Sequence, residues 1–585
     1  MKRPKANRAA AAAAQTASVQ AAEERSASGW LAWAGLTLLA VAIGWVAYAP
    51  AISGGYVFDD VALTFRSDPN YGARGLRGGF QGVRPLTELS YWLCYQIGGN
   101  RPFLQHLASL LLHAGSSVLL GYILLRLLSL AGLAEKHRNW IAMLGAGIFL
   151  VHPANTEAVA YISSRSEALS MFFYLGALAV FVGRREAAIS WARAMGVLGC
   201  FVLAMLSKEH SLTLPVALVL IDMWAFRLSP LGLAKQGWRL YGLLVGGAAV
   251  GAAVVLNTLR GAVTAGFGMK DLQWWEYLLT QGRAIALYFR LYVLPVGQSG
   301  DYLFPISRSP LEHGAIFYWI AIVAAAVAAI VYRKRAPLVS LGILLFLLLL
   351  MPTSSILPIQ DAAVERRVYL ASLGLVIATV GLLARLALSK EMLRYGGLAL
   401  LGILAIGSFQ RSTVWASHEA FWNDVIAKNP QSWRANVQIG LTALEQNRCQ
   451  EAIERFETAL PRVADNFASS LHMNYAGALS CVGRNDDAEK EFRLSLSLEN
   501  QPATWTQLGI FYARNQQNAE AMEAFNQAIA RGPNFPLGWS NRGNLHAREG
   551  NCEAAVEDFE HALQLMPSNT TAQRGLAYCR ERSGK

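Results

Sequence analysis

The chain has 585 residues, of which 54% are hydrophobic and only 15% are charged. A soluble chain of this length would carry roughly 25% charged residues, and the deficit here is concentrated before residue 412. The formal net charge of +12 is often a sign of nucleic-acid binding, but many Lys and Arg residues lie in short loops between apolar runs. That distribution follows the positive-inside pattern of membrane proteins, so we reject nucleic-acid binding.

The N-terminal segment 1–28 is rich in Ala and holds almost no large apolar residues. Its first basic residues are Lys2, Arg3, Lys5 and Arg8. This composition predicts a disordered basic tail on the cytoplasmic side of a membrane. The following run, 30–50, is too long for the core of a signal peptide and lacks a convincing cleavage site, so we expect an uncleaved first span.

Eleven apolar segments before residue 412 are candidates for membrane spans, each with about 20 apolar residues or fewer where the span is buried. They are 30–50, 103–129, 139–152, 166–183, 192–207, 211–226, 240–257, 315–332, 338–351, 366–388 and 395–411. With the tail inside, every short inside loop carries Lys or Arg, as the positive-inside rule requires. An odd number of spans then predicts that the rest of the chain lies on the outer face.

A further apolar segment, 276–295, contains Glu276, Arg283 and Arg290. If it crossed the membrane, the basic cluster at 333–335 would move to the outside. We therefore interpret it as re-entrant or interfacial, since such backbone is tolerated where it is buried in protein or lines a cavity.

Near its start, the first outer loop, 53–102, has two glycines and a short segment, 56–58, with two aromatic residues. The adjacent carboxylates Asp59 and Asp60 follow. Adjacent carboxylates raise each other's proton affinity, so one of them can act as a general base toward a hydroxyl. The structural alternative is a helix cap or turn, in which Asp is also common.

Other charged clusters fall on the same side, between apolar segments. They are Arg84 before an amphipathic stretch, His152 to Glu167 with Glu157 and Arg165, Ser207 to His210 with Lys208 and Glu209, and Pro352 to Tyr369 with Glu365, Arg366 and Arg367. One charge near the bilayer core costs on the order of 3 kcal/mol, so clusters confined to one side predict a shared polar cavity. The cations there suit a phosphate, and the carboxylates suit a hydroxyl.

Two histidines of the second span, His106 and His113, lie seven residues apart and therefore on one face of a helix. Such residues are either hydrogen-bonded packing groups or, as intramembrane ionisable groups, functional candidates.

From Trp433 onward the sequence repeats with a period of about 34 residues. Small residues recur at 440, 476, 509 and 543, and aromatic residues follow at Phe456, Phe492, Phe525 and Phe559. This period and residue set are those of the tetratricopeptide repeat (TPR), an α-solenoid whose concave surface suits extended peptides. Four asparagines near its first-helix positions either hold a peptide backbone or face solvent: Asn436, Asn474, Asn541 and Asn544.

Six cysteines are scattered and form no CxxC or metal-ligand spacing. They are Cys94, Cys200, Cys449, Cys481, Cys552 and Cys579. We expect the four in the repeats to be free thiols in packed helices. If the repeats are extracytoplasmic, the alternative is a bond between Cys449 and Cys481, which fall near the inter-helix turns of adjacent units.

The ordered set of motifs resembles the transmembrane and tetratricopeptide repeat-containing (TMTC) O-mannosyltransferases and their bacterial relatives, over residues 30–580. The matching pieces are Phe58-Asp59-Asp60, Arg84-Pro85-Leu86-Thr87, His106 with His113, His152 to Val159, Ser207-Lys208-Glu209, Asp301-Tyr302 and Glu365-Arg366 with Tyr369-Leu370. The resemblance implies an all-α fold: a cytoplasmic tail at 1–28, a GT-C-like transmembrane domain at 29–412 and an extracytoplasmic TPR domain at 413–585.

The resemblance also implies transfer of a monosaccharide, with mannose expected, from a polyprenyl-phosphate carrier to Ser or Thr hydroxyls of proteins on the outer face. It implies that Asp59 or Asp60 is the catalytic base, without distinguishing them. The substrate-binding candidates are Arg84, His113, His152, Glu157, Arg165, Lys208, Glu209, Asp301, Glu365 and Arg366. No bound metal is predicted, although an Asp pair could hold a divalent cation through its oxygens. The partners are the lipid-linked donor and a protein acceptor held by the TPR domain.

The expected location is a bacterial inner membrane with a cytoplasmic N-terminus and a periplasmic TPR domain; in a eukaryote it is the ER membrane with a lumenal TPR domain. Two other classes of protein compete with the transferase. A non-enzymatic TPR scaffold for envelope assembly needs one anchoring span rather than eleven, and a lipid-linked sugar flippase would distribute polar groups across the bilayer depth.

Overall fold

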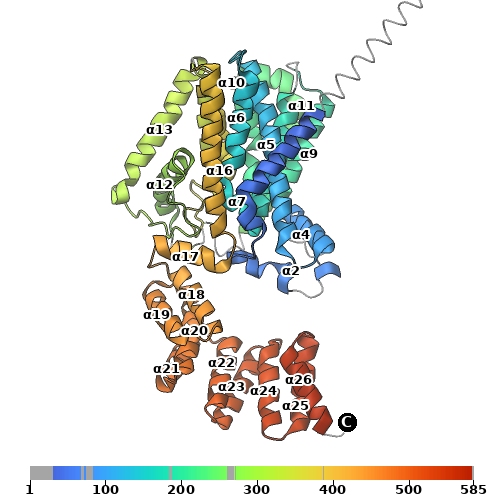
Figure 1. Cartoon of the computed structure of the whole chain (residues 1–585), viewed down its shortest axis with the longest axis vertical. Helices are drawn as coiled ribbons and strands as arrows, with labels where there is room; N and C mark the ends of the chain where they lie inside the picture. Colours follow the sequence, from blue (N-terminus) through green and yellow to red (C-terminus); the bar gives the residue numbers. More distant parts are fainter. Residues whose placement is uncertain are drawn as a thin grey trace, which may run out of the picture. The chain divides into compact units, whose positions relative to one another are not determined.

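The structure, a computed structural model, describes residues 31–582 except 68–70, 74, 76–82, 184–187, 260–265, 267–268, 270–271 and 387. Its regular elements are all helices (Figure 1), which confirms the all-α prediction. The chain divides into two compact units, one ending at Phe421 and the other starting at Trp422. The predicted tail at 1–28 lies outside the described residues.

Seven described helices of the first unit are long and apolar enough to cross a membrane. They are Leu31–Ile52, α5 (Pro102–Leu130), α8 (Arg165–Val182), α11 (Pro230–Leu259), α13 (Ala315–Val331), α15 (Arg366–Leu383) and α16 (Gly397–Val414). Three shorter apolar helices are α6 (Arg138–Val151), α9 (Trp191–Ser207) and α14 (Pro337–Leu350). With α10 (Leu214–Trp224), one helix stands at each of the eleven predicted spans.

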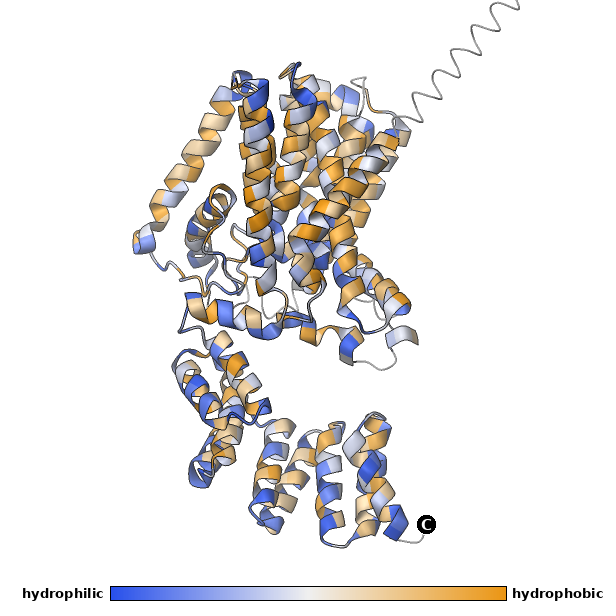
Figure 2. Cartoon of the chain, viewed as in Figure 1, coloured by the Kyte–Doolittle hydropathy of each residue, from blue (hydrophilic) through white to orange (hydrophobic). Residues whose placement is uncertain are grey.

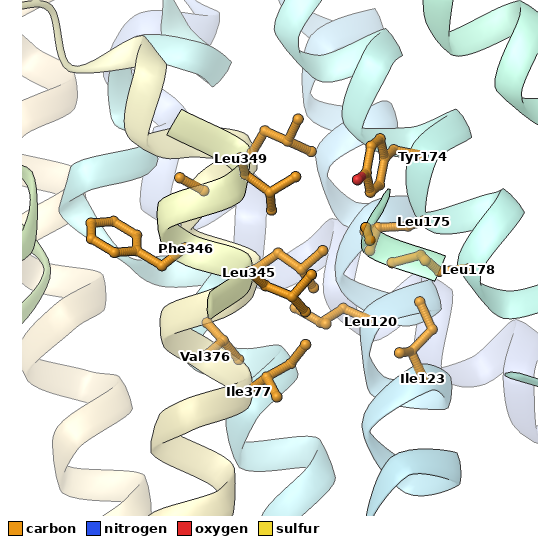
Figure 3. Packing of buried hydrophobic residues seen from close by; sticks show 14 of the residues in the cluster. Leu120, Ile123, Tyr174, Leu175, Leu178, Leu345, Phe346, Leu349, Val376 and Ile377 are labelled. Atoms are coloured by element: carbon orange, nitrogen blue, oxygen red, sulfur yellow. The ribbon is translucent and has the colours of Figure 1, made fainter. Parts of the chain in front are cut away.

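The centre of this unit is an apolar core built by α5, α8, α14 and α15. Leu120 and Ile123 of α5 lie near Leu175 and Leu178 of α8, and Leu345 of α14 completes this packing (Figure 3). The helices at the edge are apolar as well but remain mostly exposed, above all α13 (Figure 2). A helix that is apolar around its whole circumference and still exposed is typical of a lipid-facing span.

The helices α14 and α15 approach each other through glycines. A Cβ atom on Gly342 would lie 2.4 Å from the carbonyl oxygen of Gly374, and one on Gly374 would lie 2.3 Å from the backbone nitrogen of Phe346. Small residues let membrane helices pack backbone against backbone. This contact fixes α15, whose N-terminus carries Glu365 and Arg366.

The loops that the sequence assigns to the outer face meet at one end of the bundle, the lower end in Figure 1. The Gly55 N–H donates to the Ala416 carbonyl at 3.0 Å, so the loop after the first span contacts the end of α16. Thr87 Oγ1 of α4 (Pro85–Gly98) donates to the carbonyl of Ser207 at the end of α9, at 3.3 Å. The chain therefore leaves α16 at the end where the charged motifs gather.

The segment predicted to be re-entrant or interfacial forms the continuous helix α12 (Trp274–Val293), which is not among the seven spanning helices. Chain on both sides of α12 contacts the same group of loops: the Gly266 N–H donates to the Pro358 carbonyl at 2.9 Å, and Gln298 Nε2 donates to the Pro153 carbonyl at 3.0 Å. α12 thus begins and ends at one end of the bundle, as an interfacial helix would.

The second unit consists of four antiparallel helix pairs and a final helix, which confirms the repeat prediction. The pairs are α18 (Trp433–Glu445) with α19 (Cys449–Ala459), α20 (Asp465–Cys481) with α21 (Asn485–Leu498), α22 (Pro502–Arg514) with α23 (Asn518–Arg531), and α24 (Pro536–Arg548) with α25 (Cys552–Leu565); α26 (Thr570–Arg582) follows.

The repeat signature has a steric cause. A Cβ atom on Gly440 would lie 2.5 Å from the ring of Phe456, and the same distance separates a Cβ on Gly509 from Phe525. The small residue of the first helix therefore makes room for the aromatic ring of the second. Asn436 is not part of a peptide groove, because it is fully buried and its Nδ2 donates to the carbonyls of Pro430 and Ser432.

The boundary between the two units falls within α17 (His418–Lys428), nine residues after the predicted boundary of 412/413. The buried ring of Trp415 lies 5.2 Å from that of Tyr161 and 4.9 Å from that of Phe421. These contacts hold the first residues after α16 against the membrane unit.

Cys449 and Cys481 form a disulfide with a Cα–Cα distance of 6.1 Å, so the expectation of free thiols is wrong for this pair. The stacking of successive helix pairs brings the start of α19 close to the end of α20, which spacing alone does not reveal. Cys94, Cys200, Cys552 and Cys579 are free.

We expect peptide mapping without reduction to recover Cys449 linked to Cys481. A bond that closes a loop over a sequence separation of 32 residues stabilises by about 3–4 kcal/mol through the unfolded-state entropy. The double variant Cys449→Ser/Cys481→Ser should therefore unfold its repeats at lower denaturant concentration, whereas Cys552→Ser should not reproduce that loss. Quantitative alkylation of both thiols in the unreduced protein would contradict the bond.

Candidate functional site

The two adjacent aspartates have different environments, and Asp60 is the buried one. Asp60 lies in the short helix η1 (Phe58–Ala62), and its Oδ1 accepts from both the N–H and the hydroxyl of Ser163, each at 2.7 Å. Its Oδ2 accepts from the N–H groups of Val57 and Ile162 at 3.3 and 3.4 Å. Burial raises the pKa of Asp60 to about 6, since desolvation outweighs these bonds. Asp60 thus joins the first outer loop to the loop after α6.

Asp59 is exposed, and one side chain orients it. The Tyr161 hydroxyl donates to Asp59 Oδ2 at 2.8 Å and accepts from the Asp59 N–H at 3.2 Å. Burial and both nearby carboxylates raise the pKa of Tyr161 well above its ordinary value, so the phenol stays protonated and keeps donating. The accessible carboxylate of the pair is therefore that of Asp59.

The residue before this pair has an unusual backbone. Phe58 has a φ of 54°, in the left-handed region that a bulky residue rarely adopts. Its ring stacks on Phe421 at 5.5 Å and on Tyr161 at 6.0 Å. Such a conformation costs on the order of 1–3 kcal/mol and persists only where packing imposes it. The aromatic stack therefore helps to set the position of Asp59.

Arg366 lies beside this group, at the N-terminus of α15. Its guanidinium donates to Glu157 Oε1 at 2.7 Å, and its backbone N–H donates to Glu157 Oε2 at 3.0 Å. Glu157, in the short helix α7 (Thr156–Ala160), is buried, whereas a quarter of the Arg366 side chain is exposed. Arg366 also acts electrostatically on Tyr161. Asp59, Tyr161, Arg366 and Glu157 therefore form one cluster.

Two further cations border this cluster. Lys208 Nζ donates to the buried Glu167, and Arg84 forms two bonds of 3.1 Å with Glu209 in the short helix η4 (Glu209–Thr213). Burial lowers the pKa of Lys208, and the charges of Arg84 and Arg366 act in the same direction. The structure thus brings Arg84, Lys208 and Arg366 within electrostatic reach of one another, each with a carboxylate partner.

Glu365, the residue before Arg366, binds a different loop. Its carboxylate accepts from Gln298 Nε2 at 2.7 Å, from the Ser299 N–H at 2.8 Å and from the Tyr302 hydroxyl at 2.6 Å. Burial raises the pKa of Glu365. Asp301 is buried in the same loop, and the Ser299 hydroxyl donates to its carbonyl at 2.9 Å. Glu365 and Asp301 therefore belong to the support of the site.

Three predicted substrate-binding residues have packing contacts instead. His113 accepts from the Tyr369 hydroxyl at 2.8 Å and donates to the Leu150 carbonyl at 2.9 Å. His152 accepts from the Ala154 N–H at 3.1 Å and donates to the Tyr292 carbonyl at 2.8 Å. Both nitrogens of each ring are thus occupied by protein, and neither histidine offers a free group to a substrate.

Arg165 is the third predicted substrate-binding residue that has packing contacts. It is fully buried, its Nε donates to Ser109 Oγ at 2.9 Å, and its other nitrogens contact Ser90, Cys94 and Gln105. These contacts hold α4 and α5 against the start of α8. The structure therefore assigns Arg165 to helix packing rather than to phosphate binding.

Sequence reasoning missed Tyr161, although it is the only described side chain shown bonding to Asp59. It stands in the motif between Glu157 and Arg165, at a position with no recognisable pattern. Trp415 was missed as well, because a lone Trp after a span is common at membrane interfaces.

Fold and site together define a multi-pass α-helical membrane protein that continues into a TPR array. Residues 502–535 match the family model described as tetratricopeptide repeat. The chain is 22% identical to protein O-mannosyl-transferase TMTC3 of Mus musculus over 92% of its own length and 65% of that protein. It is 22% identical to protein O-mannosyl-transferase F38B6.6 of Caenorhabditis elegans over 72% of its own length and 62% of the relative.

The predicted resemblance to TMTC proteins is thereby confirmed, and the chain spans just under two thirds of the length of these curated relatives. Among solved structures, it is similar to YrrB, a TPR protein with an unusual peptide-binding site, at 19% identity and a TM-score of 0.22 over 32% of this chain and 91% of YrrB. The TPR architecture of the second unit is shown by its helix pairs and by the match of residues 502–535 to the tetratricopeptide-repeat model.

We expect Asp60→Asn to destabilise the protein and Asp59→Asn to leave it stable. An amide in place of Asp60 would present a donor to the N–H groups that now donate to it, which costs about 1–3 kcal/mol. Exposed Asp59 carries no such set of bonds, so its change should stay within about 0.5 kcal/mol. Thermal unfolding in detergent measures both, and equal melting temperatures for the two variants would contradict the assignment.

The variants Asp60→Asn and Asp59→Asn should also differ in how their stability depends on pH. The pKa of Asp60 is raised from 3.8 to about 6 in the folded protein, so the folded state binds more protons than the unfolded chain between these values. Its contribution to stability therefore falls as pH rises from about 4 to about 6 and is level above that. Asp60→Asn should remove this part of the pH dependence, and Asp59→Asn should keep it.

Proposed function

We propose that this protein is a glycosyltransferase that moves a monosaccharide, mannose by its resemblance, from a polyprenyl-phosphate carrier to Ser or Thr hydroxyls of proteins on the outer face of a membrane. One observation supports this most: an accessible carboxylate, Asp59, shares a cluster with partly exposed Arg366 at one end of a membrane-spanning bundle. The relatives' names, protein O-mannosyl-transferases, agree with this proposal.

Asp59 is the proposed base. The acceptor hydroxyl approaches its exposed carboxylate and transfers a proton to it as the oxygen attacks the anomeric carbon. Tyr161 holds the carboxylate by one oxygen and leaves the other for the acceptor. Asp60 keeps the loop in place and does not itself react, because four donors from the protein occupy its oxygens.

The leaving group is the lipid phosphate. As the bond from the acceptor oxygen to the anomeric carbon forms, the bond from that carbon to the phosphate oxygen breaks, and the electron pair stays on the phosphate. This single displacement inverts the anomeric centre, as expected of a GT-C-like enzyme. Arg366 and Lys208 stabilise the growing negative charge, and the guanidinium has further N–H donors beside the one given to Glu157.

Two independent features support the proposed membrane orientation. The basic short loops favour a cytoplasmic N-terminus, which puts the site and the start of the TPR array on the outer face. The disulfide between Cys449 and Cys481 favours an oxidising compartment for the repeats. A bacterial inner membrane with a periplasmic array, or an ER membrane with a lumenal one, meets both conditions. The array then recruits the acceptor protein.

Mass spectrometry of envelope or secretory proteins from cells with and without this chain tests the function. Hexose on Ser or Thr that disappears with the chain supports the transferase. A scaffold would leave this modification unchanged. A flippase would alter it in cells, but the purified protein would not transfer sugar from polyprenyl-phosphate mannose to an acceptor peptide.

We expect Asp59→Asn to lower the transfer rate of the purified protein by roughly 100- to 10,000-fold, the usual loss for a general base. Asp60→Asn should retain part of the activity, in proportion to its folded fraction. The assay follows mannose transfer from polyprenyl-phosphate mannose to a Ser/Thr peptide. Wild-type rates in Asp59→Asn would exclude it as the base.

We expect a reporter fused after Lys585 to report an outer-face location. Alkaline phosphatase, which needs an oxidising compartment, should be active there, and a reporter that works only in the cytoplasm should be silent. Matched fusions after Arg335, in a predicted inside loop, should give the opposite pattern. Cytoplasmic activity at Lys585 would overturn the orientation.

A further inference from the structure

The last two repeats and the final helix line an open cavity of about 610 Å³. Its polar walls come from α22 and α24, the first helices of the last two pairs, and from the final helix α26; its lining also includes Phe525 of α23. The lining residues are Ile510, Ala513, Arg514, Phe525, Asn541, Asn544, Leu545, Ala547, Arg548, Thr571, Arg574, Gly575 and Tyr578. A cavity of this size is in the range that holds a drug-sized ligand, and so a few peptide residues.

The charged residues of this lining are all arginines: Arg514, Arg548 and Arg574, with no Asp or Glu among the lining residues. All three side chains are exposed. Within the described part of the chain, Arg514 and Arg574 have no ion pair or side-chain hydrogen bond, and Arg548 donates only to the Ala513 carbonyl, at 3.4 Å. Three cations thus face one cavity without a carboxylate to neutralise them.

This arrangement differs from that of other arginines in the same unit. Arg542 forms two bonds with Asp558, at 2.9 and 2.7 Å, and Arg484 bonds to Asp487 at 2.9 Å. Several other arginines of the unit thus have a carboxylate partner, whereas the three of the cavity share one lining without any and present a local excess of positive charge.

The rest of the lining suits a peptide main chain. Asn541 Nδ2 donates to the Leu537 carbonyl at 2.8 Å, which fixes the side chain with its oxygen left as an acceptor. Asn544 is half-buried, and its amide bonds to no other described residue. Amide groups can bond both the N–H and the C=O of a backbone. Ile510, Phe525 and Leu545 add an apolar part to the lining.

We propose that this cavity binds an extended acidic peptide segment, with carboxylates on Arg514, Arg548 and Arg574, backbone on Asn541 and Asn544, and an apolar side chain against Leu545. Charge complementarity selects the occupant, because guanidinium groups bond carboxylates in pairs. The amide and apolar lining favours a peptide over a bare anionic headgroup. As a device for choosing acceptor proteins, the cavity rests on the proposed function, but peptide binding itself does not.

The test uses the full-length protein in nanodiscs of neutral lipid and fluorescence anisotropy of a short labelled peptide of alternating Glu and Leu. We expect saturable binding that weakens with salt, and no comparable binding of the matched Gln and Leu peptide. The variant Arg514→Gln/Arg548→Gln/Arg574→Gln should lose about 10-fold or more in affinity, that is ~1.4 kcal/mol per factor of ten.

The matched control is Arg462→Gln/Arg493→Gln/Arg531→Gln, which removes the same charge from exposed positions outside the cavity lining. It should bind as the wild type does. Equal affinity in the two triple variants, or equal binding of the Gln and Leu peptide, would overturn the proposal. Phosphatidylglycerol vesicles that bind through the three cavity arginines while the acidic peptide does not would also overturn it in favour of a lipid surface.

An activity readout separates this proposal from the proposed function. In the transfer assay, the cavity variant should raise the KM for acidic acceptor peptides and leave kcat unchanged. A protein that binds the acidic peptide through the arginines but transfers no sugar would refute the transferase and keep the peptide site. A protein that transfers sugar with the same KM in the cavity variant as in the wild type would keep the transferase and refute the role of the cavity in choosing acceptors.

Discussion

The membrane unit depends on the N-terminus of α15, where two consecutive side chains bind separate parts of the chain. Arg366 is held by Glu157 through its guanidinium and its backbone N–H, and Glu365 accepts from Gln298, Ser299 and Tyr302. The loop after α6 and the loop after α12 are thereby tied to one helix end. Breaking a buried ion pair by removing one partner costs about 3–5 kcal/mol, so this end of the bundle has little freedom to rearrange.

A similar arrangement of contacts explains why one of the two adjacent aspartates is buried and the other is exposed. A loop that must present a carboxylate near a lipid surface also needs an anchor, and consecutive residues of η1 point in different directions. Asp60 supplies the anchor by accepting four hydrogen bonds, and Phe58, held at a positive φ by its ring contacts, turns the chain at that point. Asp59 is then left exposed and oriented by Tyr161. One buried and one accessible carboxylate follow from this geometry without any difference in residue type.

Much of the fold is predictable because its signals are local. Apolar runs of span length and a period of about 34 residues need no knowledge of tertiary contacts, and the Gly440 and Phe456 contact shows why the repeat keeps its small and aromatic positions. The site was less predictable. Whether His113, His152 and Arg165 face a substrate or a neighbouring helix depends on partners distant in sequence, as does the bond between Cys449 and Cys481. The residue types show that these positions are unusual in an apolar segment or a repeat, but they do not show which side chain or backbone group each one contacts.

The cations of the two units differ in whether they have a carboxylate partner. In the membrane unit, Arg84, Lys208 and Arg366 each have a carboxylate partner. For Lys208 and Arg366, which are mostly buried, an unpaired charge would be costly. Pairing fixes their positions before any ligand arrives, which suits a site that must stabilise charge as it develops. In the repeat unit water screens charge, and Arg514 and Arg574 can stay unpaired at little cost. Fixed, paired cations are suited to chemistry, whereas exposed, unpaired ones are suited to capturing an anionic partner that varies in sequence.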